Sequence, residues 1–480
     1  RVPYIDYIDD SLNNSQKAAI ENALSCENFF LIHGPFGTGK TRTLVELISQ
    51  ETRQNHKVLA TAESNAAVDN ILERLIENKK LNLTRLGHPQ RVSENNISQT
   101  LAYKVEKHEL NRRVKKIQKK IEKLVETRNL HTRPSPQFRR GLSDYEILNN
   151  ASKGKSSRGV SPEKMKSMAK WIECNQEIDE LHDDIKRVEN KIIRDIVETS
   201  DVILTTNSSA ALDSISKVKF DVAIIDEASQ ATIPSILIPI AKSRRFILAG
   251  DHKQLPPTII SKKAKELEKT LFEELIKLYP SKSQLLNVQY RMNKMLMKFP
   301  NKEFYNNGLK SDSSVDEIKI DDLLRSDNHE DALLFINTSN AYGNKENHLK
   351  DSKSIINELE SDIAVKIAKD YLDAGVIADD IGIISPYADQ VKIIDNNTPV
   401  EVKTVDGFQG REKEIIIIST VRSNDDGNIG FLKDLRRLNV AITRAKRKLI
   451  IIGNKETLKN SPTYARLIDF VENEDLLIDV

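Results

Sequence analysis

The chain has 480 residues, 39% of them hydrophobic and 30% charged, so it is long enough for about three domains and has a globular composition. Its 73 Lys and Arg nearly cancel 71 Asp and Glu, and a net charge of +2 neither indicates nor excludes a nucleic-acid partner. Two isolated cysteines, Cys26 and Cys174, argue against a disulfide framework or a zinc site. No apolar run approaches the ~20 residues that span a bilayer.

These features favour a reducing compartment, and we expect a cytoplasmic protein, or a nuclear one in a eukaryote, without a membrane partner. No secretory signal opens the chain. Because the sequence begins with Arg1 rather than Met, we expect it to be a fragment of a longer protein.

Short apolar runs that end in polar loops predict buried parallel strands. In the first half these runs are "NFFLIHG", "HKVLATAES", "SDVILTTNS", "FDVAIIDEAS" and "RRFILAGDH". In the second half they are "ALLFINTS", "DIGIISPY", "EIIIISTVRS" and "KLIIIGN". The pattern predicts an α/β fold with two parallel-sheet domains in tandem. We place the first domain at residues 1–99 and 199–282 and the second at 283–480.

A charged segment, residues 100–198, separates the two parts of the first domain. It contains two apolar series at heptad spacing, which predict an antiparallel helical hairpin. One series is Leu110, Val114, Ile117, Ile121 and Leu124, and the other is Ile178, Leu181, Ile185, Val188 and Ile192. Between them lies a polar stretch that we expect to form a basic tip, with Arg139, Arg140, Lys153, Lys155 and Arg158. This hairpin is either a nucleic-acid contact or a merely structural arm.

The stretch "GPFGTGKT", residues 34–41, matches the phosphate-binding loop G-x-x-x-x-G-K-[ST] between a strand and a helix. Its glycines let backbone N–H groups turn toward phosphate, and the helix N-terminus behind them favours negative charge. Lys40 is expected to neutralise phosphate oxygens and Thr41 to bind Mg²⁺. The residues expected to hold the nucleotide phosphates are Gly34, Pro35, Gly37, Thr38, Gly39, Lys40, Thr41 and Arg42.

Two carboxylates end the predicted strand in "VAIIDEASQ". Asp226 can hold Mg²⁺, and Glu227 can orient and deprotonate the attacking water. In "LAGDHKQLPP" the next strand is followed by Asp251 and Gln254, and Gln254 can respond to the γ-phosphate. ATP and Mg²⁺ are therefore the expected cofactors. A transporter ATPase, a GTPase-like switch and a motor all remain compatible with these motifs.

Arginine motifs in the second half favour a motor. "LLNVQYRMN" presents Arg291, and "RRLNVAITRAK" presents Arg437 and Arg444. Arginines that reach the γ-phosphate from another domain accelerate phosphoryl transfer by about 10³ to 10⁵. We expect arginines of these two motifs to act with Lys40, Asp226, Glu227 and Gln254, and the resemblance described next implies that they are Arg291 and Arg444.

Eight motifs in order resemble those of the superfamily-one helicases. They are "LNNSQ", "GPFGTGKT", "ESNAAVDN", "DEASQ", "GDHKQLPP", "NVQYRM", "VDGFQGREKEIIIIS" and "LNVAITRAKR". They are most similar to the branch that contains the up-frameshift, immunoglobulin-mu-binding and senataxin helicases. Only the insert tip and the polar patch at 306–360 lie outside this resemblance, and we expect that patch to be surface elaboration.

The resemblance implies two RecA-like domains with ATP between them and a single strand of RNA or DNA across both. It implies that Gln16 reads adenine, that Tyr290 stacks near the base or ribose, and that Glu412 approaches the ribose or phosphates. It places five residues against the nucleic-acid backbone: Ser64, Asn65, Thr205, Pro386 and Thr404. It identifies residues 100–198 with the small helical accessory domain of this branch. Members of this branch usually carry a β-barrel ahead of the adenine-reading motif, whereas only about a dozen residues precede it here, so either the barrel was cut away or this member lacks it.

We therefore expect a monomeric ATP-dependent helicase that moves 5′ to 3′ on single-stranded nucleic acid. The alternative is an ATP-controlled clamp that remodels protein–nucleic acid complexes with little unwinding. A nucleic-acid-independent ATPase is disfavoured by the backbone-contact segments. If the tip cations bind phosphates, their neutralisation should lower the salt dependence of binding.

Overall fold

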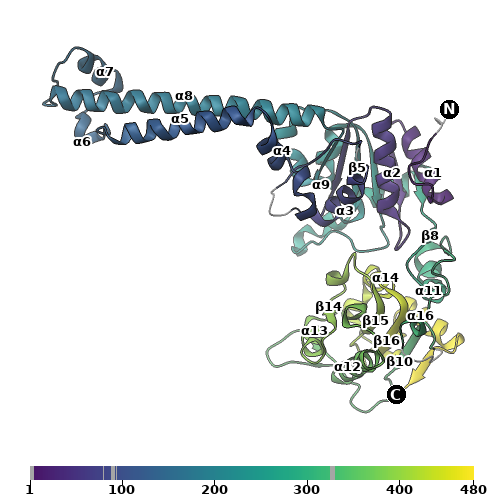
Figure 1. Cartoon of the computed structure of the whole chain (residues 1–480). Helices are drawn as coiled ribbons and strands as arrows, with labels where there is room; N and C mark the ends of the chain where they lie inside the picture. The colour runs from purple at the N-terminus through teal and green to yellow at the C-terminus, as the bar shows by residue number, and fades with distance from the viewer. Residues whose placement is uncertain (1–4, 79, 88–91, 93, 325–329) are drawn as a thin grey trace. The chain divides into compact units, whose positions relative to one another are not determined.

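The computed structural model describes residues 5–78, 80–87, 92, 94–324 and 330–480 (Figure 1). The chain forms two compact units. Unit 1 comprises residues 1–74, 206–208 and 220–480, and unit 2 comprises residues 75–205 and 209–219.

Unit 1 contains a first parallel sheet with the strand order β2-β5-β6-β1-β7. Its strands are β1 (Phe29–His33), β2 (Val58–Ala62), β5 (Phe220–Asp226), β6 (Ser243–Gly250) and β7 (Ser283–Leu285). All residues of β2 are buried, as expected for a strand covered on both faces. Although β7 falls in the range that we assigned to the second domain, it pairs with β1.

Five helices of the described residues accompany this sheet. They are α1 (Asn14–Ser25), α2 (Lys40–Arg53), α3 (Asn65–Ile76), α9 (Ile233–Ala241) and α10 (Leu271–Leu278). Asn13 caps α1 and forms a reciprocal capping box with Gln16. Gly39 precedes α2 with a φ of 75°, a conformation that glycine adopts without steric cost. The N-terminus of α2 therefore follows directly on the loop between β1 and α2, which is the predicted phosphate-binding loop.

A second parallel sheet in unit 1 has the strand order β14-β13-β15-β16-β10-β17. Its strands are β10 (Leu333–Asn337), β13 (Ile381–Ile384), β14 (Glu401–Lys403), β15 (Lys413–Ser419), β16 (Ala445–Gly453) and β17 (Leu477–Asp479). Its helices are α11 (Lys294–Tyr305), α12 (Glu358–Asp373), α13 (Ala388–Asp395), α14 (Leu435–Ile442), α15 (Lys455–Leu458) and α16 (Pro462–Asn473).

Strand β15 shows why this sheet is buried on both faces. Ile415 and Ile417 belong to a core that includes residues of α12 and α13. Ile416 and Ile418 belong to a separate core that includes residues of α11, α14 and α16. Because successive side chains of a strand point to opposite faces, the run "IIII" requires helices on both sides of the sheet.

Short strand pairs elaborate the second half of unit 1. They are β8 (Val288–Gln289) with β9 (Lys310–Ser311), and β11 (Asn347–His348) with β12 (Ile355–Ile356). The polar patch at 306–360 includes β9, β11 and β12, and residues 325–329 of it lie outside the described residues. Ile320 from this patch is buried in the core beside α12, so the patch is tied to the domain at that point.

Unit 2 contains β3 (Leu83–Arg85), which pairs in parallel with β4 (Val202–Thr206), and a helical hairpin. The hairpin helices α5 (Asn111–Asn129) and α8 (Pro162–Thr199) lie side by side, and α4 (Leu101–Lys107) precedes them (Figure 1). Val114 packs with Val188 and Ile192. Near the other end of α5, Arg128 Nη1 donates to Asn175 Oδ1 at 2.9 Å, so the helices run antiparallel. The hairpin expected from the two heptad series is therefore present.

The tip of the hairpin is a folded lobe rather than a polar loop. It contains α6 (Pro136–Arg139) and α7 (Asp144–Ser152). Seven buried side chains form its core: Leu142, Ile147, Val160, Met165, Met168, Ala169 and Ile172. Three of the tip arginines make contacts within this lobe. Arg139 pairs with Asp144 at 2.7 Å, and the Nη1 groups of Arg140 and Arg158 donate to each other's main-chain carbonyls.

The predicted fold class is confirmed: two parallel-sheet, RecA-like domains follow each other, with a helical hairpin inserted. Among the described residues, no helix combines the length and the apolarity that a membrane span requires.

Candidate ATP site

A cavity of about 910 Å³ in unit 1 is lined by residues that follow strands of the first sheet and by residues of the second half of the chain. All the residues that we predicted to be catalytic or to bind the nucleotide line it. They are Gln16, Gly34, Pro35, Gly37, Thr38, Gly39, Lys40, Thr41, Arg42, Asp226, Glu227, Gln254, Tyr290, Arg291, Glu412 and Arg444. The structure thus brings together residues that are more than 400 positions apart.

The phosphate-binding loop contacts the second half of the chain through its backbone. The N–H of Tyr290 donates to the carbonyl of Gly37 at 2.7 Å. Gly37 has a φ of 63°, and a Cβ at this position would lie 2.6 Å from Cβ of Arg291. Glycine is therefore required here both for the turn and for the close approach of Arg291.

Lys40 and Asp226 form an ion pair at the end of β5. Burial lowers the pKa of Lys40, but the adjacent Asp226 carboxylate more than offsets burial and the pKa lies above its ordinary value. Lys40 therefore stays cationic and can bind phosphate oxygens. Thr41 follows it on the first turn of α2 and also lines the cavity.

Glu227 is held in an unusual conformation next to Asp226. Its φ of 53° lies in the left-handed region, which a non-glycine residue adopts at a cost of roughly 1–3 kcal/mol. The N–H and Oγ of Ser64 donate to Glu227 Oε2 at 3.1 and 2.9 Å and fix the carboxylate. Burial and the nearby Asp226 charge raise the pKa of Glu227, as a proton acceptor in catalysis requires.

Arg291 and Arg444 bring two guanidinium groups to the cavity. Arg291 Nε donates to Glu412 Oε2 at 2.5 Å, and its Nη1 donates to the Thr443 carbonyl at 2.8 Å. Arg444 is only 1% exposed, and burial together with the like charge of Arg291 lowers its pKa to about 9. A buried cation beside a second cation favours an anionic ligand such as a phosphate.

Glu412 contacts Arg291 and Lys446 rather than standing free in the cavity. Burial raises the pKa of Glu412, but these two cations outweigh burial, and its pKa lies below the ordinary value. Glu412 therefore orients Arg291, and its expected approach to the ribose or phosphates stays a prediction.

Gln254 belongs to a buried network centred on Asp251. Gln254 Nε2 donates to Asp251 Oδ2 at 2.7 Å, and Arg444 Nη2 lies 3.4 Å from Gln254 Oε1. Asp251 Oδ1 lies 2.8 Å from His33 Nε2, at the end of β1. Although burial raises the pKa of Asp251, its hydrogen bonds with His33, Tyr305 and Gln254 outweigh burial and lower the pKa to about 2. The carboxylate is therefore a permanent acceptor that holds Gln254.

Gln16, which also lines the cavity, is 1% exposed and uses both ends of its side-chain amide. Gln16 Nε2 donates to the Thr38 carbonyl at 3.1 Å, and Oε1 accepts from the N–H of Asn13 at 2.9 Å. Asn13 Nδ2 also donates to the Tyr290 hydroxyl at 2.9 Å. Gln16 therefore starts α1 and contacts the phosphate loop, whereas adenine recognition stays a prediction.

The residues expected to contact nucleic acid occupy three different environments. Ser64 lines the ATP cavity, and Asn65 is the first residue of α3. Pro386 and Thr404 follow β13 and β14, which are parallel neighbours, so both lie at the carboxyl edge of the second sheet. Thr205 in β4 is fully buried, and its hydroxyl donates to the Leu86 carbonyl at 3.4 Å. A contact by Thr205 would therefore have to use its main chain.

The cavity also contains residues to which we had assigned no role, although most of them lie within the quoted motifs. Ala67, Asn70 and Arg74 follow one another at three- and four-residue spacing on one face of α3. Gln409 and Arg411 come from the loop "VDGFQGRE". Helical periodicity starting from Ser64 was the signal that could have identified the α3 face.

Known proteins resemble this chain over nearly all of its length. A family model described as an AAA domain matches residues 11–262, and a second one with this description matches residues 267–456. The chain is 46% identical to an uncharacterized ATP-dependent helicase of Methanocaldococcus jannaschii, over 98% of this chain and 72% of that protein.

Two eukaryotic relatives share about a third of their aligned residues with the chain. The DNA polymerase alpha-associated DNA helicase A of Saccharomyces cerevisiae is 36% identical over 94% of this chain and 66% of its own length. The DNA-binding protein SMUBP-2 of Rattus norvegicus is 35% identical over 98% of this chain and 45% of its own length. The chain thus spans less than half of the rat protein.

Proposed function

Because the chain belongs to the superfamily-one helicases of the up-frameshift, immunoglobulin-mu-binding and senataxin branch, we propose that it is a motor that moves 5′ to 3′ on single-stranded nucleic acid and separates duplexes. Members of this family are ATP-dependent helicases. The observation that carries the proposal is the ATP cavity, in which Lys40, Asp226 and Glu227 meet Arg291 and Arg444.

The residues of the cavity have different roles in the hydrolysis of ATP. Lys40 and the N–H groups of the phosphate loop bind the phosphates, and Glu227 accepts a proton from the attacking water. Arg291 and Arg444 stabilise the charge that develops on the γ-phosphate, and Gln254 beside Arg444 responds to its presence. The side chains of Glu227, Arg291 and Gln254 are already oriented by hydrogen bonds from or to Ser64, Thr443 and Asp251.

The site suits Mg²⁺ as the metal cofactor. The Thr41 hydroxyl and the Asp226 carboxylate line the cavity and are hard oxygen ligands. Mg²⁺ is typically bound by one or two such protein groups together with phosphate oxygens and water. When bound, it would neutralise negative charge on the phosphates.

Movement follows from the way in which the cavity is built. Because residues of both parallel-sheet halves line it, binding of ATP favours a closed arrangement and release of phosphate permits opening. A strand gripped differently in the two states would be displaced by one step per cycle. We propose that Ser64, Asn65, Thr205, Pro386 and Thr404 belong to the segments that grip its backbone.

Such backbone contacts are tolerant of the sugar, so the strand is RNA, DNA or both. We further propose that the protein acts as a monomer. We assign it to the cytoplasm, or to the nucleus in a eukaryote.

The decisive experiment combines ATP hydrolysis with strand displacement. We expect single-stranded RNA or DNA of equal length to stimulate hydrolysis at a stated salt concentration. We also expect displacement of a duplex with a 5′ tail but not of the same duplex with a 3′ tail. Displacement only from the 3′ tail would overturn the direction. Stimulated hydrolysis without displacement would support the ATP-controlled clamp instead.

A further inference from the structure

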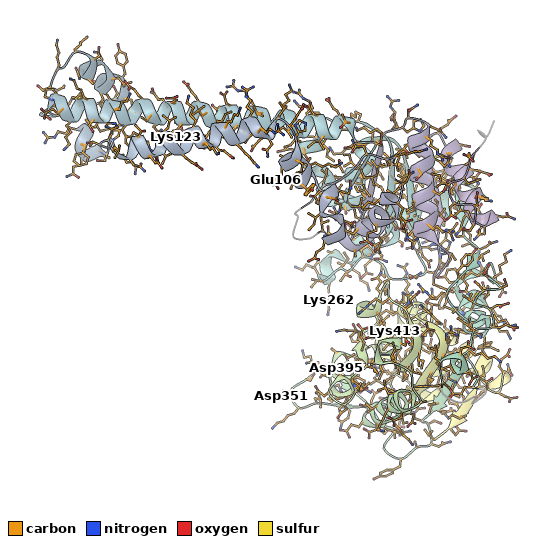
Figure 2. The ribbon with its side chains drawn as sticks, viewed as in Figure 1. Glu106, Lys123, Lys262, Asp351, Asp395 and Lys413 are labelled. Atoms are coloured by element: carbon orange, nitrogen blue, oxygen red, sulfur yellow. The ribbon has the colours of Figure 1, made fainter. Side chains whose placement is uncertain are left out.

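Helix α5 in the hairpin carries a surplus of positive charge. Of its 19 residues, eight are Lys or Arg and two are Glu, a surplus of six. Seven of these cations are exposed, and we call this set the α5 stripe: Arg112, Arg113, Lys115, Lys116, Lys119, Lys120 and Lys123. Figure 2 labels Lys123 on this helix. The apolar residues Val114 and Ile121 face α8 and leave the stripe on the outside of the pair.

The hairpin does not neutralise the α5 stripe internally. Among the described residues, one ion pair joins α5 to α8, between Lys120 and Glu177 at 2.7 Å. No carboxylate of the described residues lies within ion-pair distance of the other six cations. Several of these cations lie one helical turn apart, an arrangement of like charges that destabilises a helix. A charge pattern that opposes folding is expected where a ligand compensates for it.

The facing segment of α8 has the opposite charge. Residues 173–184 contain six acidic side chains and no Lys or Arg. Two of the acids pair within their own helix, Glu173 with Lys170 at 3.0 Å and Asp184 with Arg187. Over this stretch the hairpin therefore has a cationic side on α5 and an acidic side on α8, which favours contact of a polyanion with α5. Nearer its C-terminus α8 carries exposed cations of its own, Lys186, Lys191 and Arg194.

The composition of α5 indicates which polyanion fits. Proteins that bind single strands combine cations with aromatic side chains on which the bases stack, and α5 contains no aromatic residue. A duplex has its bases already stacked and offers a phosphate about every 1.7 Å along its axis. Arg112 and Lys123 are eleven positions apart, which is about 16 Å along a helix. A straight row of cations of this length can contact several phosphates of a duplex.

We propose that the α5 stripe is a binding surface for the sugar–phosphate backbone of double-stranded nucleic acid. This surface is additional to the strand-gripping segments of the proposed motor. It also differs from the tip, where Arg139 is paired with Asp144 and Arg158 lies 4.0 Å from Glu146. Binding would be independent of base sequence, because only phosphates are contacted.

The test compares two variants of the full chain that lose the same charge. The α5 variant carries Lys115→Gln, Lys116→Gln, Lys119→Gln and Lys123→Gln. The control carries Lys166→Gln, Lys186→Gln, Lys191→Gln and Arg194→Gln, four exposed cations of α8. Gln has nearly the helix propensity of Lys and Arg, so both variants should keep the hairpin. Circular dichroism checks this.

The probes are a blunt-ended duplex and a single strand with the same number of nucleotides. For each, Kd is measured over a salt series in the absence of ATP. We expect the α5 variant to bind the duplex more weakly and to lower the slope of log K against log salt by about 0.9 for each phosphate that it no longer binds, about 4 at most. The control should change the slope by less than about 1. ATP hydrolysis without nucleic acid should be unchanged in both.

Three outcomes would overturn the proposal. One is an unchanged duplex slope in the α5 variant, and another is an equal decrease in both variants. The third is a decrease confined to the single strand, which would make that strand the ligand. Stimulation of hydrolysis by single strands is measured in parallel, so failure of the proposed motor is distinguished from failure of this surface.

Discussion

The Tyr305 hydroxyl donates a 2.6 Å hydrogen bond to Asp251 Oδ2, the oxygen that also accepts from Gln254. Tyr305 ends α11, and Asp251 follows β6 of the first sheet. Asn439 Nδ2 donates in turn to the Tyr305 hydroxyl at 2.8 Å. Tyr305 therefore joins α14 and α11 to the residue that holds Gln254. We infer that it positions Gln254 without touching the nucleotide.

Tyr305→Phe should lower the kcat of ATP hydrolysis about tenfold with little change in KM, because Gln254 loses part of its support while the phosphate loop is intact. Asp251 keeps its contacts with His33 and Gln254, so we expect the fold to survive with a loss of about 1–2 kcal/mol in the free energy of unfolding. Steady-state kinetics and thermal unfolding measure the two effects.

Tyr464→Phe is the matched control for that variant. Tyr464 is buried in the same core as Tyr305, and no hydrogen bond of its hydroxyl is found among the described residues. Its removal should leave kcat unchanged. If Tyr305→Phe and Tyr464→Phe had the same kinetics, Tyr305 would be a packing residue only.

Glu227→Gln should abolish proton acceptance from the attacking water while preserving the hydrogen bond from Ser64. We expect ATP binding to stay near normal and hydrolysis to fall by roughly 10²-fold or more. Equilibrium binding of ATP and single-turnover hydrolysis measure these separately. Lost affinity with intact turnover per bound ATP would contradict the assignment.

The raised pKa of Glu227 has a consequence for the pH dependence of hydrolysis. A base works only when it is deprotonated, so activity should decline as the pH falls through the pKa of Glu227. Because burial raises that pKa, the decline should begin at a higher pH than for an ordinary Glu. Ser64→Ala removes the hydrogen bond from the Ser64 hydroxyl to the ionised Glu227 carboxylate. If the backbone also shifts, the hydrogen bond from the Ser64 N–H is lost as well. In either case the acid limb of the kcat profile should move further upward.

Arg291→Ala and Arg444→Ala should each lower turnover sharply, by about 10³-fold, because both groups stabilise charge in the transition state. A single-turnover assay at saturating ATP measures the chemical step. A near-normal rate for either variant would remove that arginine from the mechanism. Arg437→Ala provides a comparison, since Arg437 is paired with Asp406 and Asp434 and does not line the cavity.

Much of the ATP site could be predicted because its chemistry is local in the sequence. The phosphate loop lies in one turn between β1 and α2, and Asp226 and Glu227 directly end a buried strand. Tyr305 could not be predicted in this way, because its contact with Asp251 spans 54 residues and arises only when α11 packs. Sequence motifs identify the residues that contact a ligand. Residues that only position those groups, such as Tyr305, are brought to the site by tertiary packing and have no local signal.

The hairpin illustrates the same limit at the level of the fold. Val114 and Ile192 each belong to an apolar series at heptad spacing, one on α5 and one on α8. The two long helices were therefore evident from periodicity. In the tip, Leu142, Ile147 and Val160 are scattered among polar residues without a period, and the lobe core that they form was missed. The other four core residues, Met165, Met168, Ala169 and Ile172, recur at helical spacing on α8, but the short segments that pack on them show no period.

Gln16 should confer a preference for ATP over GTP, because a side-chain amide can donate to and accept from the adenine edge. In the structure both ends of this amide are engaged, by Thr38 and Asn13. Adenine recognition therefore requires the amide to exchange or share these partners. Competition between ATP and GTP in Gln16→Ala measures the preference. An unchanged ratio would leave Gln16 with only its role in the capping box of α1.

Replacement of residues 101–197 by a short linker should preserve basal ATP hydrolysis. Every residue that lines the ATP cavity lies at or before Arg74 or at or after Asp226, so the chemistry needs none of the hairpin. The hairpin also has apolar cores of its own, around Ile192 between α5 and α8 and around Ile147 in the tip lobe. Hydrolysis without nucleic acid, measured at saturating ATP, checks the expectation.

A point variant shows whether destabilising the hairpin, without removing it, affects ATP hydrolysis. Ile192→Ala deletes a fully buried side chain and should destabilise the hairpin by about 2–5 kcal/mol, with faster proteolysis of residues 101–197 as the readout. If the hairpin is dispensable for the chemistry, this variant and the linker variant should hydrolyse ATP at the basal rate of the intact chain. Loss of hydrolysis in the linker variant would show that the hairpin braces the first sheet, because no cavity residue was removed.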